Sequence, residues 1–401
     1  MSGVVVVGAG QAGASCVARL RTKGYQGAIT LIGDEPVPPY QRPPLSKAYL
    51  LGDLPLDRLF LRPESYYADQ DISLRTGETV TNIDPVARTV TTQSGGVPYD
   101  DLVLATGAAP RHLPDAIGGS LEGVFCVRTL ADVDAMAPHF VDGARVLIVG
   151  GGYIGLEAAA VAAKLGVHVT LLEAAPRILQ RVAAEQTSEY FRAAHAAQGV
   201  TLCEGVGLSR LIGDTSVKQA ELTDGAVLDV DFVIVGVGVT PAQHLAEIAG
   251  VKVDNGIAVD SLGRTSDRHI WAAGDCASFP GPKARIRLES VGNAIDMGEL
   301  VADNILGEDR AYVARPWFWS DQYDIKLQIA GLSTGFDHVV SRGSGASVSF
   351  WYYAEGQLIA LDAMNDPRAY MVGKRLIEAG KSPDPVLLAD PATNLKTLLK
   401  G

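Results

Sequence analysis

Short apolar runs that lead into glycines are the clearest pattern along this chain. Val4–Val7 is a continuous apolar run, and residues 8–13 directly after it are rich in glycine. A helical stretch over residues 14–23 follows, and residues 28–32 form a second apolar run. Continuous rather than alternating apolar residues are typical of parallel strands buried on both faces. The pattern therefore predicts a strand, a tight turn, a helix and a second parallel strand.

The same order of elements returns about 140 residues later in the chain. Arg145–Val149 is an apolar run, and residues 150–155 form a second glycine-rich segment. A helical stretch continues to about residue 165, and residues 168–172 form the next apolar run. Each copy is a βαβ unit. Two such units predict an α/β fold with two Rossmann-like dinucleotide-binding domains.

The remaining pattern extends these domains and adds a third. Apolar runs that end in small residues occupy residues 102–107, 232–238 and 270–275, and a helical stretch covers residues 289–306. After Pro316 the pattern of apolar and polar residues changes. Residues 325–330, 347–353 and 358–363 predict antiparallel strands, and residues 369–379 predict a helix. We therefore expect a third, C-terminal α+β domain.

Each glycine-rich turn has the spacing of a phosphate-binding motif. The motif glycines are Gly8, Gly10 and Gly13 in the first copy and Gly150, Gly152 and Gly155 in the second. The first glycine makes the tight bend, the second lets the backbone approach a pyrophosphate, and the third lets the helix pack on the strand. Small residues can also merely relieve crowding at a turn. Two copies, each between a strand and a helix, favour phosphate binding.

Acidic residues at the end of the second strand of each copy support this interpretation. Asp34 and Glu35 follow the first copy, and Glu173 follows the second. A carboxylate at this place hydrogen-bonds a ribose, although each could also be a solvated loop residue. Glu173 would accept a ribose 2′-OH and repel a 2′-phosphate, which favours NADH over NADPH. Arg177 and Arg181 lie nearby and weaken that preference.

Composition excludes several other classes of protein. The 401 residues include 34 Lys+Arg and 46 Asp+Glu, so the formal charge is 34 − 46 = −12, which disfavours a nucleic-acid partner. No apolar run approaches the ~18 residues of a membrane span. The four cysteines, Cys16, Cys126, Cys203 and Cys276, form no CxxC or CxxxxC pair. Without a secretory leader, this predicts a reduced, cytoplasmic protein.

Several short motifs accompany the glycine turns. They are Pro43-Pro44-Leu45-Ser46-Lys47, Ala105-Thr106-Gly107, the segment from Gly150 to Glu157, Gly274-Asp275 and Pro316-Trp317-Phe318-Trp319-Ser320. With them the chain resembles, over nearly its whole length, the two-dinucleotide-binding flavoprotein superfamily, whose fold is glutathione reductase-like. Within it the chain resembles NADH-dependent ferredoxin reductases of the putidaredoxin reductase and biphenyl dioxygenase reductase type. It departs from them at Gly292 and Met297-Gly298, where relatives often carry Gln or Pro.

The resemblance implies two cofactors, FAD and NADH, and the residues that hold them. The residues implied for FAD are Gly8, Gly10, Ala12, Gly13, Asp34, Glu35, Arg42, Lys47, Val80, Ala105, Thr106, Gly107, Arg128, Gly274, Asp275 and Val291. The residues implied for NADH are Gly150, Gly152, Tyr153, Ile154, Gly155, Glu157, Glu173 and Gly238. Arg42 and Lys47 could instead be exposed cations in a proline-rich loop, and Gly274-Asp275 could be a turn that closes a strand.

The resemblance also implies a charged pair of Lys47 and Glu157 beside the flavin N5 edge, which would position the nicotinamide. These two are the candidate catalytic residues. Counted from the last glycine, Glu157 falls in the first helical turn, where a carboxylate also suits the helix dipole. Trp317 and Trp319 alternate along an extended segment, so both side chains point to one side. They are either core of the third domain or a docking site for the electron acceptor.

The cysteine pattern argues against a thiol relay between the flavin and the electron acceptor. Disulfide reductases of this superfamily carry a CxxxxC or CxxC pair, and peroxide-reducing relatives carry a reactive cysteine near position 42. Here that place is Tyr40-Gln41-Arg42-Pro43, and Cys16 and Cys276 are expected to be buried packing. Electrons must therefore leave the flavin directly. We hypothesise a hydride transfer from NADH to flavin and single-electron transfers to a transiently bound [2Fe–2S] ferredoxin, which serves a cytochrome P450 or a ring-hydroxylating oxygenase.

These inferences give a domain map. We expect an FAD-binding domain of residues 1–110 and 242–316, an NAD(H)-binding domain of residues 111–241 and a C-terminal domain of residues 317–401. The alternatives are a rubredoxin reductase, a more distant monodehydroascorbate-type reductase, and a cofactor-binding redox sensor like the apoptosis-inducing-factor relatives. No metal site, membrane attachment or particular oligomeric state is predicted.

Overall fold

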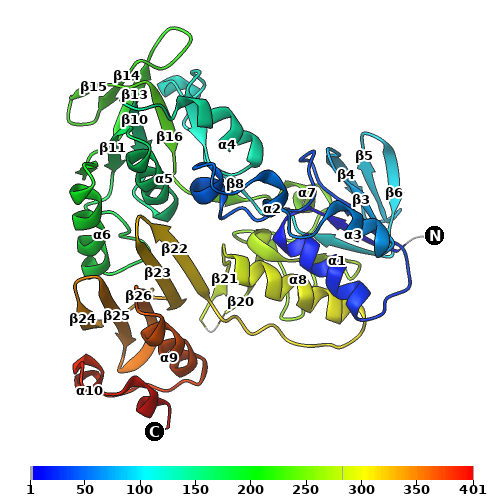
Figure 1. Cartoon of the computed structure of the whole chain (residues 1–401). Coiled ribbons are helices and arrows are strands. Elements are labelled where there is room, and N and C mark those ends of the chain that lie inside the picture. Colours follow the sequence, from blue (N-terminus) through cyan, green and yellow to red (C-terminus); the bar gives the residue numbers. More distant parts are fainter. Residues whose placement is uncertain (1–2, 282, 401) are drawn as a thin grey trace. The chain divides into compact units, whose positions relative to one another are not determined.

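A computed structural model describes residues 3–281 and 283–400 of the chain (Figure 1). The chain forms two compact units. The first contains Met1–Gln41, Pro55–Ala109 and Val239–Pro316. The second contains Arg42–Leu54, Pro110–Gly238 and Trp317–Gly401. The expected domain map stays a prediction.

The first unit is built on a five-stranded parallel sheet. Its strand order is β19 (Ile270–Ala272), β7 (Asp101–Leu104), β1 (Val4–Val7), β2 (Ile29–Ile32) and β3 (Ile72–Arg75). All four residues of β1 are buried, which agrees with its unbroken apolar sequence. In parallel sheets, ligands bind beyond the carboxyl ends of the strands. This sheet holds the carboxyl ends of its five strands side by side.

Two helices far apart in the sequence pack closely in this unit. They are α1 (Gln11–Thr22) and α8 (Val291–Ile305), drawn blue and yellow in Figure 1. A Cβ on Gly298 of α8 would lie 2.4 Å from the Ala12 carbonyl oxygen of α1. The glycine at 298 is thus required by this close helix contact.

Smaller elements complete the first unit. They are the antiparallel sheet β4 (Val80–Asp84), β5 (Thr89–Thr92) and β6 (Gly95–Pro98); the sheet β18 (Ile257–Ala258), β20 (Ala277–Pro280) and β21 (Arg285–Ile286); the pair β8 (Ala108–Pro110) and β17 (Val239–Pro241); the helices α2 (Leu56–Leu59), α3 (Glu64–Asp69) and α7 (His244–Ile248); and the 3₁₀ turn η4 (Gly274–Cys276).

The second unit contains another five-stranded parallel sheet. Its order is β12 (Thr201–Glu204), β11 (His168–Glu173), β10 (Arg145–Val149), β16 (Phe232–Val235) and β9 (Val124–Cys126). With it belong α4 (Leu130–Met136), α5 (Tyr153–Lys164), α6 (Glu185–Ala197), the antiparallel sheet β13 (Leu208–Ile212), β14 (Gln219–Leu222) and β15 (Val227–Asp229), and the one-turn elements η1 (Leu45–Tyr49), η2 (Asp115–Ile117) and η3 (Ala137–His139).

An antiparallel sheet forms the C-terminal part of the second unit. Its order is β22 (Trp317–Gln322), β23 (Ile325–Gly331), β26 (Gln357–Met364), β25 (Ser347–Ala354) and β24 (His338–Ser344). The helix α9 (Pro367–Glu378) lies against β23 and β26 (Figure 1), and α10 (Pro385–Ala389) and η5 (Leu395–Leu399) follow it. A Cβ on Gly373 of α9 would lie 2.2 Å from a Leu361 methyl carbon, so the glycine permits this close packing.

The predicted fold class is confirmed: two parallel sheets with glycine-turn βαβ units and a C-terminal antiparallel sheet with a helix. The strands β1 and β10 have the predicted bounds, and α9 begins two residues before the predicted helix. The strand β24 and the two antiparallel sheets β4–β6 and β13–β15 were not predicted.

Candidate functional site

The three glycines of the first turn have different surroundings. Gly8 has a φ of +111°, and a Cβ on it would lie 2.1 Å from the Ala105 carbonyl oxygen. A Cβ on Gly13 would lie 2.1 Å from the Gly8 carbonyl oxygen. A Cβ on Gly10, in contrast, would meet nothing within 4 Å. The first and third glycines are therefore required by the protein's own packing, whereas the second borders open space.

The second turn repeats this arrangement. Gly150 has a φ of +111°, and a Cβ on it would lie 2.5 Å from the Gly236 carbonyl oxygen. A Cβ on Gly155 would lie 2.1 Å from the Gly150 carbonyl oxygen, while one on Gly152 would meet nothing within 4 Å. No side chain in the described part of the chain caps the helix that starts after either turn. Uncapped N–H groups beside open space suit a phosphate, so both turns fit a dinucleotide.

We expect Gly10→Ala to weaken FAD binding without unfolding the protein. The added methyl group meets no protein atom, so the free energy of unfolding of the apoprotein should change by less than about 1 kcal/mol. The same methyl group would occupy the space through which a pyrophosphate approaches, so flavin affinity should fall about tenfold, or about 1.4 kcal/mol. Titration of apoprotein with FAD and urea unfolding measure the two effects.

Two matched variants control this experiment. Gly152→Ala should weaken NADH binding and leave FAD binding unchanged, because Gly152 belongs to the second glycine turn. Gly8→Ala should destabilise the fold itself, since its φ of +111° and the carbonyl 2.1 Å away both exclude a side chain. A Gly10→Ala protein that binds FAD with unchanged affinity would contradict the assignment of this turn.

Most of the residues expected at the FAD site lie at the carboxyl edge of the first parallel sheet. Asp34 and Glu35 follow β2, Ala105, Thr106 and Gly107 follow β7, and Gly274 and Asp275 follow β19. A Cβ on Gly274 would lie 2.9 Å from the Ala12 Cβ, so η4 and α1 also approach each other here. The first unit therefore brings these segments together beside Gly8.

Individual contacts hold this edge in shape. The Thr106 hydroxyl donates to the Ala242 carbonyl at 2.6 Å, and the Tyr40 hydroxyl donates to Glu35 at 2.6 Å. Val291 is the first residue of α8, next to its cap Ser290. Val80 begins β4 and is buried.

Arg42, Lys47 and Arg128, also expected at the FAD site, belong to the second unit. There Arg42 donates from Nη1 to the Arg128 carbonyl at 2.7 Å.

The residues expected at the NADH site gather at the carboxyl edge of the second parallel sheet. Glu173 ends β11 and accepts from the Gly151 amide at 2.8 Å and the Ala175 amide at 2.7 Å. Gly238, with a φ of +103°, follows β16. Ile154 is 44% exposed at the start of α5, available to a ligand. These positions agree with the expected nucleotide fingerprint.

Tyr153 contributes to this edge through its backbone. Its ring packs on Phe318 of β22, with ring centroids 5.1 Å apart, and its hydroxyl is buried without a hydrogen-bond partner in the described part of the chain. The side chain is directed into the C-terminal sheet, so an interaction of Tyr153 with a nucleotide is confined to its amide.

Lys47 and Glu157 form a buried ion pair in the second unit. The Lys47 Nζ lies 2.6 Å from the Glu157 Oε2, and the two side chains are 17% and 4% exposed. Lys47 also donates to the Pro43 carbonyl at 3.2 Å, within the Pro-Pro-Leu-Ser-Lys motif. The pairing that the resemblance implied therefore exists, and Lys47 is not an exposed loop cation.

The expected place of Glu157 in the first helical turn is wrong. The helix α5 begins at Tyr153, directly after Gly152, and has no acidic residue in its first turn. Glu157 is the fifth residue of that helix and lies in its second turn. The backbone N–H groups of the glycine motif itself form the first turn, so Glu157 serves the ion pair rather than the helix dipole.

Two serines complete the surroundings of Glu157. The Ser320 hydroxyl donates to Oε1 at 2.7 Å, and the Ser46 hydroxyl donates to Oε2 at 3.1 Å. Burial raises the pKa of Glu157, and Lys47, Ser320 and Ser46 oppose that rise. The carboxylate therefore depends on these three donors to stay ionised. Sequence reasoning did not assign either serine, although both lie in motifs that it quoted.

Trp317 and Trp319 lie on one side of β22, as their alternation predicted. Their rings stack with centroids 5.5 Å apart, and the Lys374 Nζ lies 5.4 Å from the Trp317 ring centroid. Both tryptophans remain partly exposed. They are not closed core, and their role in docking stays a prediction.

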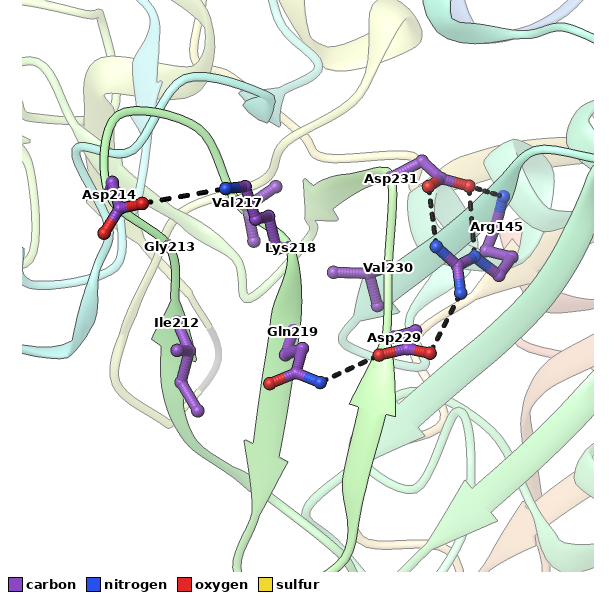
Figure 2. Close-up of a pocket in the computed structure, with 10 residues that line it drawn as sticks. All are labelled: Arg145, Ile212, Gly213, Asp214, Val217, Lys218, Gln219, Asp229, Val230 and Asp231. Carbon is purple, nitrogen blue, oxygen red and sulfur yellow. Dashed lines mark hydrogen bonds and ion pairs between the residues drawn. The ribbon is translucent and has the colours of Figure 1, made fainter.

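The groove of about 660 Å³ in Figure 2 lies away from these sites. It includes Arg145, the first residue of β10, and so marks the amino end of the strand whose carboxyl end carries the glycine turn. Arg145 pairs with Asp229 at 3.2 Å and Asp231 at 2.8 Å, as Figure 2 shows. The positive charge of Arg145 is thus already matched by these two carboxylates, which disfavours a phosphate beside it.

The cysteines do not provide a reactive thiolate. All four are free, and Cys16 and Cys276 are buried, as predicted. Burial raises the pKa of Cys16 to about 12 and that of Cys126 to about 11. It also raises the pKa of Cys203 and Cys276. Thiols that keep their protons are poor nucleophiles and poor redox relays.

The described residues contain no group of three or more His, Cys, Asp or Glu residues that could hold a metal ion. None of their helices combines the length and apolar character needed to cross a membrane.

Comparison with known proteins agrees with this geometry. Residues 2–298 match the family described as pyridine nucleotide-disulphide oxidoreductase. The chain belongs to this family. Residues 317–399 match the family described as reductase C-terminal. Membership in the pyridine nucleotide-disulphide oxidoreductases implies an oxidoreductase with FAD and NAD(P)H as cofactors.

The similarity to individual ferredoxin reductases extends over the whole chain. A ferredoxin–NAD(P)(+) reductase from Sphingomonas sp. is 45% identical, over 99% of this chain and 97% of that protein. The covalent putidaredoxin reductase–putidaredoxin complex contains a chain with a TM-score of 0.96 and 39% identity, covering 100% of this chain and 98% of that one. The ferredoxin reductase for the CYP199A2 system from Rhodopseudomonas palustris has a TM-score of 0.95 and 40% identity, covering 99% of each chain. The family and the fold expected from the sequence are thereby confirmed.

Proposed function

We propose that this protein is an FAD-dependent NADH:ferredoxin reductase. Its acceptor would be a [2Fe–2S] ferredoxin that serves a cytochrome P450 or a ring-hydroxylating oxygenase. The two glycine turns would hold FAD and NADH, and bound FAD would supply the chemistry of hydride acceptance and of single-electron transfer to such an acceptor. The observation that carries the proposal is that both glycine turns border open space in a chain similar along its length to ferredoxin reductases.

Each part of the chain has a separate task in this proposal. Residues 1–110 and 242–316 bind FAD, residues 111–241 bind NADH, and residues 317–401 form the C-terminal domain. Gly10 and Gly152 leave room for the two pyrophosphates. Asp275 and the segment from Ala105 to Gly107 lie at the same sheet edge as Gly8 and would hold the flavin nucleotide there.

Glu173 supports NADH rather than NADPH as the donor. Its carboxylate is anchored by two backbone amides, so it can accept a ribose 2′-OH and would repel a 2′-phosphate. Arg177, which could have bound a 2′-phosphate, instead donates to the Ser188 hydroxyl at 2.5 Å and the Ala183 carbonyl at 2.9 Å. Its guanidinium is thus already hydrogen-bonded at the start of α6.

Lys47 and Glu157 position the nicotinamide in this proposal. A carboxylate with a fixed orientation can accept hydrogen bonds from the carboxamide of a nicotinamide ring, and the lysine holds that carboxylate in place. Neither residue needs to act as a general acid or base. Their contribution is orientation and charge.

The stacked tryptophans support a protein acceptor. Trp317 and Trp319 present partly exposed aromatic surface beside the Lys374 cation. Aromatic residues are enriched in the centres of protein interfaces, and the Lys374 cation would favour an acidic partner. The absence of a cysteine pair in the sequence leaves direct transfer to such a partner as the electron route.

Purified protein carrying FAD tests this proposal. NADH should bleach the flavin rapidly and NADPH at least about tenfold more slowly, a difference of about 1.4 kcal/mol. Cytochrome c should then be reduced only when a [2Fe–2S] ferredoxin is added. Faster turnover with rubredoxin would identify a rubredoxin reductase instead. Slow bleaching to a persistent charge-transfer complex, with no acceptor turning over, would identify a redox sensor and refute the reductase assignment.

A further inference from the structure

A row of polar side chains leads away from Glu157 through the second unit. Ser320 donates to Glu157, and the Gln322 Nε2 donates to the Ser320 hydroxyl at 3.1 Å. The His195 Nε2 lies 2.8 Å from the Gln322 Oε1, and the Tyr323 hydroxyl lies 2.8 Å from the His195 Nδ1. Ser320, Gln322 and His195 are each 0% exposed. Four side chains from α5, α6 and β22, together with Tyr323 in the turn after β22, thus form one continuous hydrogen-bonded row.

The alternation of β22 explains how this row forms. Ser320 and Gln322 are two residues apart, so their side chains point to the same side of the strand. That side faces α5, which carries Glu157, and α6, which carries His195. Trp317 and Trp319 occupy the other side. One strand therefore presents its two tryptophans on one side, and on the other side the polar row beside Phe318, which packs on Tyr153 of α5.

The direction of every bond in the row follows from an ionised Glu157. A carboxylate only accepts, so Ser320 must donate to it, and the Ser320 oxygen must then accept from the Gln322 amide nitrogen. This orientation turns the Gln322 oxygen toward His195, which must donate from Nε2. The His195 Nδ1 is left to accept from the Tyr323 hydroxyl. All donors in the row therefore point toward Glu157.

The protonation states agree with this direction. Burial lowers the pKa of His195, although the Gln322 bond opposes the change, so the imidazole is neutral near pH 7. Burial raises the pKa of Tyr323, so its hydroxyl keeps its proton. The row thus contains neutral donors and ends on one carboxylate.

Tyr323 is held in an unusual backbone conformation. Its φ is +57°, in the left-handed region that favours glycine or asparagine in a tight turn. A bulky residue at such a place costs free energy, which the surrounding structure must offset. The hydroxyl bond to His195 and the edge-on ring contact with it, at 5.1 Å, are what the tyrosine provides there.

We propose that Ser320, Gln322 and His195 are positioning residues, with Tyr323 at their far end, that hold Glu157 ionised and fixed in orientation beside Lys47. This inference rests on the proposed role of Glu157 toward the nicotinamide. The charged group that acts on Glu157 among the described residues is Lys47 of η1, while β22 contributes only the neutral Ser320 hydroxyl. Protonation of Glu157 would reverse the row and move the His195 proton from Nε2 to Nδ1.

The His195 tautomer tests the row in the full chain without any cofactor turnover. Protein labelled with ¹⁵N-histidine should give a neutral His195 that carries its proton on Nε2 near pH 7, with the resonance assigned from a His195→Gln variant. In Glu157→Gln, whose amide can donate to Ser320, a mixture of tautomers is expected. An Nδ1-protonated ring or an imidazolium in the unsubstituted protein would overturn the proposal. This measurement stands even if NADH proves not to be the donor.

Ser320→Ala and Ser320→Thr separate positioning from packing. Loss of the hydroxyl should raise the apparent pKa seen in NADH-driven flavin reduction by about one unit, since a bond to a carboxylate is removed. Threonine keeps the hydroxyl and should restore the profile. Tyr323→Phe keeps the ring and should shift the profile in the same direction by less. An unchanged pH profile in Ser320→Ala would refute the positioning role, whereas an unmodified enzyme that NADH does not reduce would refute the proposed function.

Discussion

Lys47→Met is expected to destabilise the protein by about 3–5 kcal/mol at pH 8, because it leaves the buried Glu157 carboxylate without its counter-charge. The pair is short, 2.6 Å, and the Glu157 side chain is only 4% exposed, so water cannot replace the ammonium. Ser46 and Ser320 remain as donors but carry no charge. Urea unfolding of the full chain measures the loss.

The pH dependence of this loss has a definite sign. Burial raises the pKa of Glu157 even with Lys47 present, and removal of the ammonium raises it further. A carboxyl group whose pKa is raised in the folded state stabilises the fold below its unfolded pKa, and this contribution is lost as the pH rises through the folded pKa. The Lys47→Met protein should therefore lose most stability at alkaline pH and least near pH 5.

Two controls show whether burial is the cause. Lys47→Met combined with Glu157→Gln removes both charges and should recover most of the stability. Arg210→Met breaks a pair of the same unit with a similar distance, 2.7 Å to Glu221, but with side chains 61% and 31% exposed. It should cost less than about 1 kcal/mol. Equal losses from Lys47→Met and Arg210→Met would mean that the buried pair has no special contribution.

Much of the fold could be predicted from the sequence because the local sequence marks where its two central strands begin and end. Val4–Val7 and Arg145–Val149 are apolar without interruption and end at glycines that the turn requires. The strand His338–Ser344 has no such signal. Only Val340 of its seven residues is buried, since it lies at the edge of the sheet, so no apolar run marks it. Edge strands and short exposed hairpins form because they pair with neighbouring strands, and the local sequence contains no signal of that pairing.

The same limit applies to the site. The glycine turns and Glu173 follow from local spacing and could be predicted. The bond between Ser320 and Glu157 joins residues 163 positions apart, and the one between His195 and Gln322 joins residues 127 positions apart. No local pattern links them. The family resemblance supplied the Lys47–Glu157 pair, but counting from the last glycine placed Glu157 one helical turn too early.

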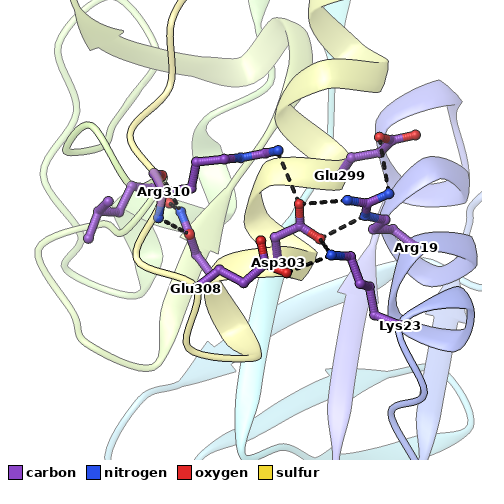
Figure 3. A network of polar contacts seen from close by, with 8 residues as sticks. Arg19, Lys23, Glu299, Asp303, Glu308 and Arg310 are labelled. Atoms are coloured by element: carbon purple, nitrogen blue, oxygen red, sulfur yellow. Dashed lines mark hydrogen bonds and ion pairs between the residues drawn. The ribbon is translucent and has the colours of Figure 1, made fainter.

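Asp303→Asn is expected to have the second large effect, about 3–5 kcal/mol, this time in the first unit. Asp303 lies in α8 with a fully buried side chain, and Figure 3 shows three cations directed at it. Arg19 of α1 donates to both carboxylate oxygens, at 2.7 and 3.0 Å, and the Arg310 Nη2 lies 3.1 Å away. The Lys23 Nζ is more distant, at 3.9 Å. Removal of the carboxylate leaves these cations clustered without their shared partner.

Acid should remove this contribution in the unsubstituted protein. Burial alone would raise the pKa of Asp303, but Arg19, then Arg310 and Lys23, outweigh it and lower the pKa. A carboxyl group with a lowered pKa stabilises the fold above its unfolded value, near 3.8, and this contribution is lost as the pH falls through the folded pKa. The two proteins should therefore differ fully at pH 7 and converge below about pH 4.

Glu299→Gln is the matched control for this carboxylate. Glu299 lies on the same helix, 4.0 Å from the Arg19 Nη1, but its side chain is 43% exposed, so its loss should cost less than about 1 kcal/mol. Because Asp303 joins α8 to α1, and α1 begins at the first glycine turn, Asp303→Asn should also release FAD at lower urea concentrations than global unfolding requires. If flavin release coincides with global unfolding in both the unsubstituted protein and Asp303→Asn, the contact between α8 and α1 does not affect FAD binding at the first glycine turn.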